Sequence, residues 1–64
     1  MSEKRARDVT TKDFVRLFGD QEFAKVVDVK VRGEDVLIDV QWPGAVFPSS
    51  LPALDGDEVV EVQS

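Results

Sequence analysis

The 64-residue chain contains no cysteine, no histidine and no tyrosine. Without cysteine it cannot form a disulfide, and without cysteine or histidine it cannot build the usual zinc sites. The same absences remove the side chains that most often serve as nucleophile or general base near neutral pH. Ser49 and Ser50 have no histidine to activate them, so their hydroxyls fit a loop or a cap better. We therefore expect a chain that is not an enzyme and uses no cofactor.

Long apolar runs are also missing. No stretch approaches the roughly 18 apolar residues that span a bilayer. The opening MSEKRARDVTTKDF is charged and is followed by no apolar stretch, so it does not fit a secretory signal. We expect a cytoplasmic protein that does not contact a membrane.

The sequence has little to hold a phosphate or a metal. The glycines at 19, 33, 44 and 56 are too far apart for a phosphate-cradling loop. Two groups of carboxylates could attract a hard cation, but neither has the alternating spacing of a calcium loop. We expect these groups to be solvated and to bind no metal; they are Asp55, Asp57 and Glu58 in one, and Asp28, Asp39 and Glu61 in the other.

What the chain does contain is enough apolar material for one small core. Hydrophobic residues make up 42% of it and charged residues 33%. A domain of this size buries only about 60% of the surface of its unfolded chain, so its stability is marginal. Small domains recover stability from disulfides, metals or association. Because the first two are excluded, the composition favours self-association or a protein partner.

Charge is distributed unevenly along the chain, whose formal net charge is −5. Positive residues crowd the first quarter, and ten carboxylates lie between Asp20 and Glu61. This asymmetry predicts a flexible charged arm over residues 1–8 and a single domain over residues 9–64. The acidic body disfavours nucleic acid as a partner. Two alternatives remain: an acidic DNA mimic that inhibits a nucleic-acid-binding protein, or a small barrel whose phosphate contacts are Arg5, Arg7, Lys12 and Arg16.

The segment VTTKDFVRLFG, Val9 to Gly19, has the local features of a helix. Thr10 can cap it, and Asp13 can reach back to the N–H of the cap. Phe14, Leu17 and Phe18 share one helical face. Gly19 can end the helix in a left-handed conformation.

Two β-strands follow, because the apolar period changes to two. Val27, Val29 and Val31 should face inward from the first strand, and Val36, Ile38, Val40 and Trp42 from the second. A two-residue turn at Gly33-Glu34 would set Val31 opposite Val36, Val29 opposite Ile38 and Val27 opposite Val40. A longer turn would instead set Lys30 opposite Asp39, and the pattern leaves both registers open.

The C-terminal third contains an uncharged segment with two prolines, AVFPSSLPAL, Ala45 to Leu54. Pro43-Gly44 before it fits a type II turn. We expect an edge strand at Ala45–Phe47, a helical turn capped at Ser49, a turn at Asp55-Gly56 and a last strand at Glu58–Val62 with Val60 and Val62 inward. The closing LPALDGDEVVEV resembles the turn and strand common in SH3-like and related small barrels, and this generic likeness implies no function.

These elements predict an α+β fold, with a short N-terminal helix packed on a small three- to four-stranded antiparallel sheet or partly open barrel. The functional hypothesis is a non-catalytic protein-interaction or assembly module that associates with itself or with another protein. Interfaces favour aromatic side chains and have little charge at their centre, as the proline-bearing segment does. The predicted contact residues are Trp42, Val46, Phe47, Leu51 and Leu54.

Overall fold

The computed structural model describes residues 2–17 and 22–63, and nearly all of its regular structure is antiparallel sheet. The α+β prediction is therefore wrong. In order along the chain, the elements are β1 (Ser2–Arg5), η1 (Ala6–Asp8), β2 (Phe14–Arg16), β3 (Ala24–Arg32), β4 (Asp35–Gln41), β5 (Ser49–Ser50), β6 (Leu54–Asp55) and β7 (Val59–Gln63). Here η1 is one short 3-10 turn, and no other helix occurs within these two stretches.

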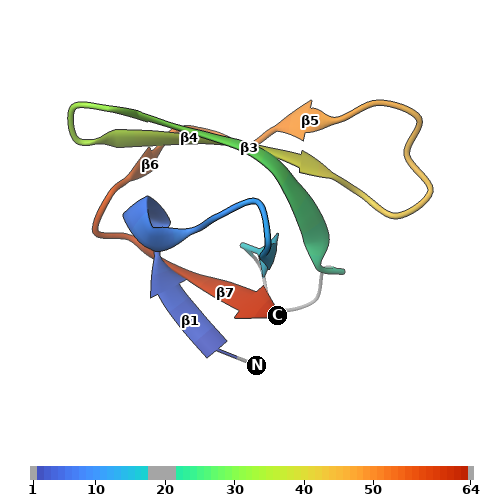
Figure 1. Cartoon of the computed structure of the whole chain (residues 1–64), viewed down its shortest axis with the longest axis horizontal. Helices are drawn as coiled ribbons and strands as arrows, with labels where there is room; N and C mark the ends of the chain where they lie inside the picture. Colours follow the sequence, from blue (N-terminus) through green and yellow to red (C-terminus); the bar gives the residue numbers. More distant parts are fainter. Residues whose placement is uncertain (1, 18–21, 64) are drawn as a thin grey trace.

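The strands form a single sheet that bends over on itself (Figure 1). Its order is β1-β7-β2-β3-β4-β5, and β6 pairs with β4 as well. β3, β4, β5 and β6 form the upper layer in Figure 1, β1 and β7 lie below it, and the long β3 bends down to join the two. The core between the layers is aliphatic, because its largest fully buried side chains are Ile38, Val15, Val26, Val36, Val40 and Val62.

The helix predicted over Val9–Gly19 is absent from the described residues. Phe14–Arg16 is instead the strand β2, which pairs with β7 on one side and with β3 on the other. The β-branched Val15 is buried between these partners. A helix of two turns is marginal by itself, so pairing with two distant strands outweighs the local helical signal. Phe18 and Gly19, which the prediction also used, lie outside the described residues.

The charged N-terminal segment, for which the sequence predicts a flexible arm, forms the edge strand β1. Ser2 lies opposite Val62 and Arg5 lies opposite Val59, so β1 extends along β7. Ala6 follows it into the core and is fully buried, and its backbone N–H donates to the carbonyl of Glu58 at 2.7 Å. These hydrogen bonds and this burial attach residues 2–6 to the rest of the domain.

The β3–β4 hairpin has the first of the two predicted registers. Val31 lies opposite Val36 and Val29 lies opposite Ile38. Gly33 has a φ of 61°, the positive value that the first central position of a type II′ turn requires. The placement of Val27 was wrong, because a bulge between Val26 and Asp28 shifts the register. Val26 is therefore opposite Val40 and buried, whereas Val27 is 42% exposed.

The segment after β4 differs from the prediction of an edge strand at Ala45–Phe47 and a helical turn at Ser49. Strand structure begins later, at β5, where Ser49 lies opposite Val40 and Ser50 opposite Asp39. A second short strand, β6, then pairs Leu54 with Val36. The backbone hydrogen-bonding groups of β4 are thus shared among β3, β5 and β6, and this pairing replaces the helical turn.

The last strand, predicted over Glu58–Val62, is found one residue later, at Val59–Gln63. The turn at Asp55-Gly56 closes with a hydrogen bond from the backbone N–H of Glu58 to the carbonyl of Asp55, at 3.0 Å. In β7, the side chains of Val60 and Val62 are buried. Val59, the first residue of the strand, is exposed. Among the described residues, no helix is long and apolar enough to cross a membrane.

Candidate functional site

The loop between β4 and β5 begins with a well-defined turn. The backbone N–H of Ala45 donates to the carbonyl of Trp42 at 3.1 Å, and Gly44 has a φ of 79°. These are the features of the type II turn predicted at Pro43-Gly44. The side-chain amide of Gln41 also donates to the carbonyl of Ala45 at 2.6 Å. The base of the loop is therefore fixed to the end of β4.

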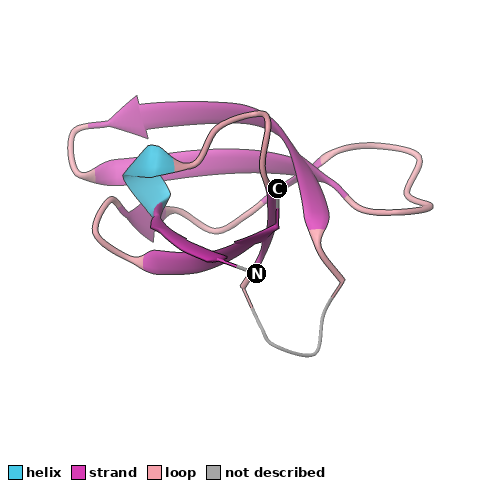
Figure 2. Ribbon diagram, turned by 60° about the horizontal axis from the view of Figure 1, so that its bottom comes forward, coloured by secondary structure: helices cyan, strands magenta, loops and turns pink. Residues whose placement is uncertain are grey.

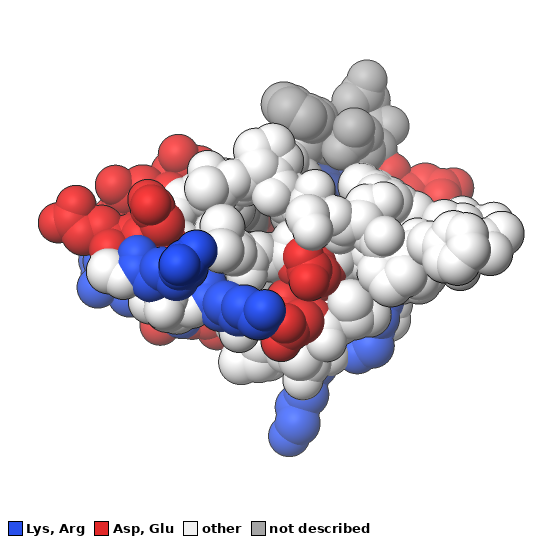
Figure 3. Space-filling model, turned by 90° about the horizontal axis from the view of Figure 1, so that it is seen from above, with Lys and Arg blue, Asp and Glu red and all other residues white. Residues whose placement is uncertain are grey.

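Beyond this turn, the loop places two large apolar side chains in solvent. Val46 is 83% exposed and Phe47 is 77% exposed, the highest values among the large hydrophobic residues described. The loop extends from the right-hand end of the upper layer in Figure 1. Seen from above, the tip at that end is uncharged, although an acidic group lies beside it, and acidic and basic side chains gather at the opposite end (Figure 3).

The five residues predicted to contact a partner are thus divided by the fold. Val46 and Phe47 are accessible. Trp42 and Leu51 are partly buried and pack against the core. Leu54 is 7% exposed and is a core residue, because β6 draws it against Val36. Of the five predicted residues, Val46 and Phe47 are therefore the two that are largely accessible to a partner.

The four basic residues proposed as phosphate contacts lie on separate elements: Arg5 on β1, Arg7 on η1, Lys12 in the loop after η1, and Arg16 on β2. Arg7 forms an ion pair with Asp57 and donates to the carbonyl of Gly56. Arg16 binds Glu61 at 2.8 Å and lies over the ring of Phe23. These two cations are already engaged with carboxylates of their own chain, which weakens the case for phosphate binding.

The carboxylates of the two predicted groups, all within the described residues, lie in different surroundings. Within residues 2–17 and 22–63, no three acidic side chains converge in a way that could hold an ion. Asp55 instead accepts the backbone N–H of Asp57 at 2.9 Å, which stabilises the turn between β6 and β7. On the sheet, Asp28 and Asp39 lie opposite each other, while Glu61 binds Arg16 elsewhere.

Of the two adjacent serines, Ser50 contacts a carboxylate. The hydroxyl of Ser50 donates to Asp39 Oδ1 at 2.8 Å, across the β4–β5 pair. This hydrogen bond links the short strand β5 to the end of β4. Within the described part of the chain, the Asp39 carboxylate is the one side chain that forms a hydrogen bond with the Ser50 hydroxyl.

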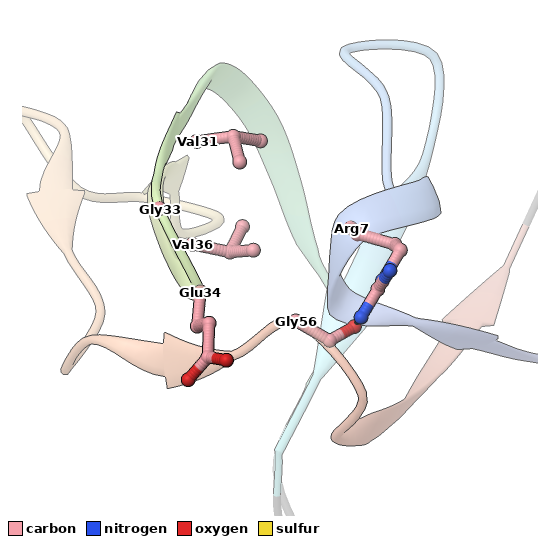
Figure 4. A pocket seen from close by; sticks show the side chains of 6 residues that line it. All are labelled: Arg7, Val31, Gly33, Glu34, Val36 and Gly56. Carbon is pink, nitrogen blue, oxygen red and sulfur yellow. The ribbon is translucent and has the colours of Figure 1, made fainter.

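A hollow of about 290 Å³ lies between the hairpin turn and η1 (Figure 4). The guanidinium of Arg7 projects toward Gly56, and the carboxylate of Glu34 points away from it. Because Arg7 is held by Gly56 and Asp57, its charge is not available to a ligand in the hollow. The described residues also include no buried polar side-chain atom that lacks a hydrogen bond. The full lining is Arg7, Val31, Gly33, Glu34, Val36 and Gly56.

Comparison of the chain with known proteins adds no information about this loop. No protein-family model, no curated protein and no solved structure matches the chain.

Proposed function

We propose that this chain is a non-catalytic protein-interaction module whose contact surface is the tip of the β4–β5 loop. The observation that carries this proposal is the exposure of Val46 and Phe47, at 83% and 77%, on a loop whose base is fixed by hydrogen bonds. Scattered exposed hydrophobic residues are ordinary in small proteins. Two adjacent large ones at a projecting tip form a local apolar surface.

The composition of the loop suits the centre of an interface. Residues 42–54 carry no charge, although a third of the whole chain is charged. Aromatic side chains that enter a pocket on a partner contribute most of the binding energy in many interfaces, and charge is depleted there. Phe47 is the residue best placed to act in this way.

The loop also needs little additional ordering to bind. Pro43 and Pro48 restrict the backbone on both sides of the tip. The hydrogen bonds at Ala45 fix the turn that precedes Val46. A restricted loop loses less conformational entropy on binding than a flexible one, so more of the contact energy becomes affinity. The matching partner is a protein with an apolar pocket, either another protein or a second copy of this chain.

A photo-crosslinking amino acid at position 47 tests the proposal. It should give a discrete crosslinked product with a partner protein, or with a second copy, in cells that express the full chain. The matched control is position 59, because Val59 is also exposed, at 59%, but lies on β7. The substitution Phe47→Ser should abolish crosslinking from position 46, and Val59→Ser should not. Equal products from positions 47 and 59 would reject a specific site at the loop.

A further inference from the structure

The outer edge of β3 is unpaired over much of its length. On the side away from β4, β2 pairs only with Ala24 and Lys25, and the backbone N–H of Val26 donates to the carbonyl of Asp13. Beyond Val26, no strand among the described residues pairs with this edge, and Figure 2 shows β3 as the outermost strand there. Residues 27–32 therefore form an open strand edge.

The hairpin turn determines which backbone groups this edge presents. Because the two-residue turn follows Arg32 directly, Arg32 and Asp35 form the hydrogen-bonded pair that closes it. Hydrogen bonding then alternates along an antiparallel pair, so Lys30 and Asp28 also bond to β4. The N–H and C=O groups of Val29 and Val31 consequently point away from β4, toward the open edge.

The side chains along this edge alternate between charge and valine. Asp28, Lys30 and Arg32 alternate with Val29 and Val31, and Val31 is 60% exposed. Asp28 lies opposite another carboxylate, Asp39, on β4. In the described part of the chain, neither Asp28 nor Lys30 forms an ion pair. Arg32 forms none among the described residues either, so the edge carries one unmatched negative charge, at Asp28, and two unmatched positive charges, at Lys30 and Arg32.

We propose that a second copy of this chain pairs with this edge, so that two β3 strands align antiparallel about a twofold axis at Val29. In this register Asp28 of each copy lies opposite Lys30 of the other, and the two Val29 residues lie opposite each other at the axis. Asp28 and Lys30 each gain an opposite charge, and the two Val29 side chains meet on the same face of the sheet. The two bent sheets become one sheet across the axis, which is an isologous interface.

Other registers are less favourable. The faces of the two sheets match only when the strands shift by an even number of residues, because side chains alternate between the faces. An axis at Asp28 brings two aspartates together, and an axis at Lys30 brings two lysines together. Lysine on an edge strand also discourages pairing with unrelated strands. The charge pattern therefore favours a second copy over a foreign peptide.

The edge strands β5 and β1 offer less backbone for pairing with a second copy. β5 has only two residues, and β1 has four. On β1, Lys4 is already bound to Asp13, so its charge is not available to a partner.

Charge reversal tests both the dimer and its register. Sedimentation of the full chain from low micromolar to high micromolar concentration should show a monomer–dimer equilibrium. K30D should weaken dimerisation about tenfold, because two opposite-charge pairs become like-charge pairs, and D28K should do the same. The double variant D28K/K30D restores both pairs with the charges exchanged, so its dimerisation constant should return to near that of the original chain.

Hydrogen exchange of the unsubstituted chain gives a second readout, and this readout does not depend on whether a variant folds correctly. The amides of Val29 and Val31 should become more protected as concentration rises, and the amide of Lys30, already bonded to β4, should change little. A monomer at every concentration would overturn the proposal, and so would a dimer that K30D leaves intact or that the double variant does not restore. Position 47 plays no part in this interface, so F47S should leave dimerisation unchanged and the two proposals can fail separately.

Discussion

The ammonium of Lys4 on β1 lies 3.0 Å from the carboxylate of Asp13, in the turn that precedes β2. The side chain of Asp13 is almost completely buried, and it also accepts the backbone N–H of Thr10 at 2.9 Å. The same residue's carbonyl accepts the N–H of Val26 from β3. Asp13 therefore joins the first strand, the turn and the central hairpin.

Substitution of Asp13 by alanine should lower the free energy of unfolding by about 2 kcal/mol, because it removes hydrogen bonds to a charged group and leaves the Thr10 N–H without its partner. Chemical denaturation followed by Trp42 fluorescence measures this change. Lys12→Met is the control, because Lys12 is exposed in the same loop, and its effect should stay within about 0.5 kcal/mol. Equal effects of the two substitutions would contradict a structural role for Asp13.

The stability of the domain should decrease in acid through Asp13. Burial raises the pKa of this carboxyl, but the hydrogen bond from the Thr10 backbone and the Lys4 ammonium lower it by more, so the pKa lies below its ordinary value. The unfolded chain then binds a proton to Asp13 more readily than the folded one. The stabilisation is present above pH about 4 and is lost as pH falls through the lower, folded-state pKa.

Unfolding free energies measured between neutral pH and pH 3 check this sign. Asp13→Asn should make stability fall less steeply in acid, because asparagine does not titrate. The other carboxylates are unchanged, so the difference between the two profiles reports Asp13 alone. A profile for Asp13→Asn that runs parallel to that of the original chain would show that Asp13 does not contribute to the pH dependence.

The parts of the fold that could be predicted from sequence are those set by neighbouring residues. The alternation around Val29 and Ile38 and the glycine at position 33 identified the hairpin and one of its registers. Pro43-Gly44 identified a turn for the same reason, because each residue type restricts its own backbone. The bulge at Val27 was missed, since nothing in the alternating pattern marks an extra residue.

The helix prediction was wrong although the predicted capping hydrogen bond forms, because that bond alone does not make the following residues helical. Thr10 and Asp13 do form the expected hydrogen bond between side chain and backbone N–H. The chain then continues as β2 instead of a helix, because Val15 pairs with Val62 and Ala24, and Val62 is distant in sequence. Local capping patterns carry no information about such distant partners.

The candidate sites were predictable to different degrees. The missing charge around Phe47 pointed to the loop, but only the pairing of Leu54 with Val36 shows that Leu54 belongs to the core. The open edge of β3 was not anticipated. The alternation of Asp28 and Lys30 was visible, yet an edge strand is recognisable only when the short reach of β2 is known.

Removal of residues 1–5 should destabilise the domain by more than about 2 kcal/mol, because it deletes β1 and the Lys4 partner of Asp13. Thermal unfolding of the shortened chain measures the loss. The control, Glu3→Gln/Arg5→Gln, removes charge but keeps the backbone pairing of β1 with β7, and it should unfold close to the original temperature. If the shortened chain were as stable as the full one, residues 2–5 would behave as an arm and not as a strand.

Ile38→Val should cost about 1 kcal/mol, because Ile38 is fully buried at the centre of β4 and the lost methyl leaves a small cavity. Val59→Ala is the surface comparison and should change stability by less than about 0.5 kcal/mol. Denaturant unfolding of both variants gives the difference. A cost at Val59 as large as that at Ile38 would contradict the division between core and surface in the sheet.

Phe47→Ser and Val46→Ser should leave stability within about 0.5 kcal/mol of the original chain, because both side chains are largely in solvent and contribute little to the core. Trp42→Ala should cost more, since Trp42 packs partly against the core at the base of the loop. Thermal unfolding at low concentration, where association is minimal, gives the comparison. Marked destabilisation by Phe47→Ser would mean that the ring packs on its own domain, and Phe47 would then be a structural residue and not a contact for a partner.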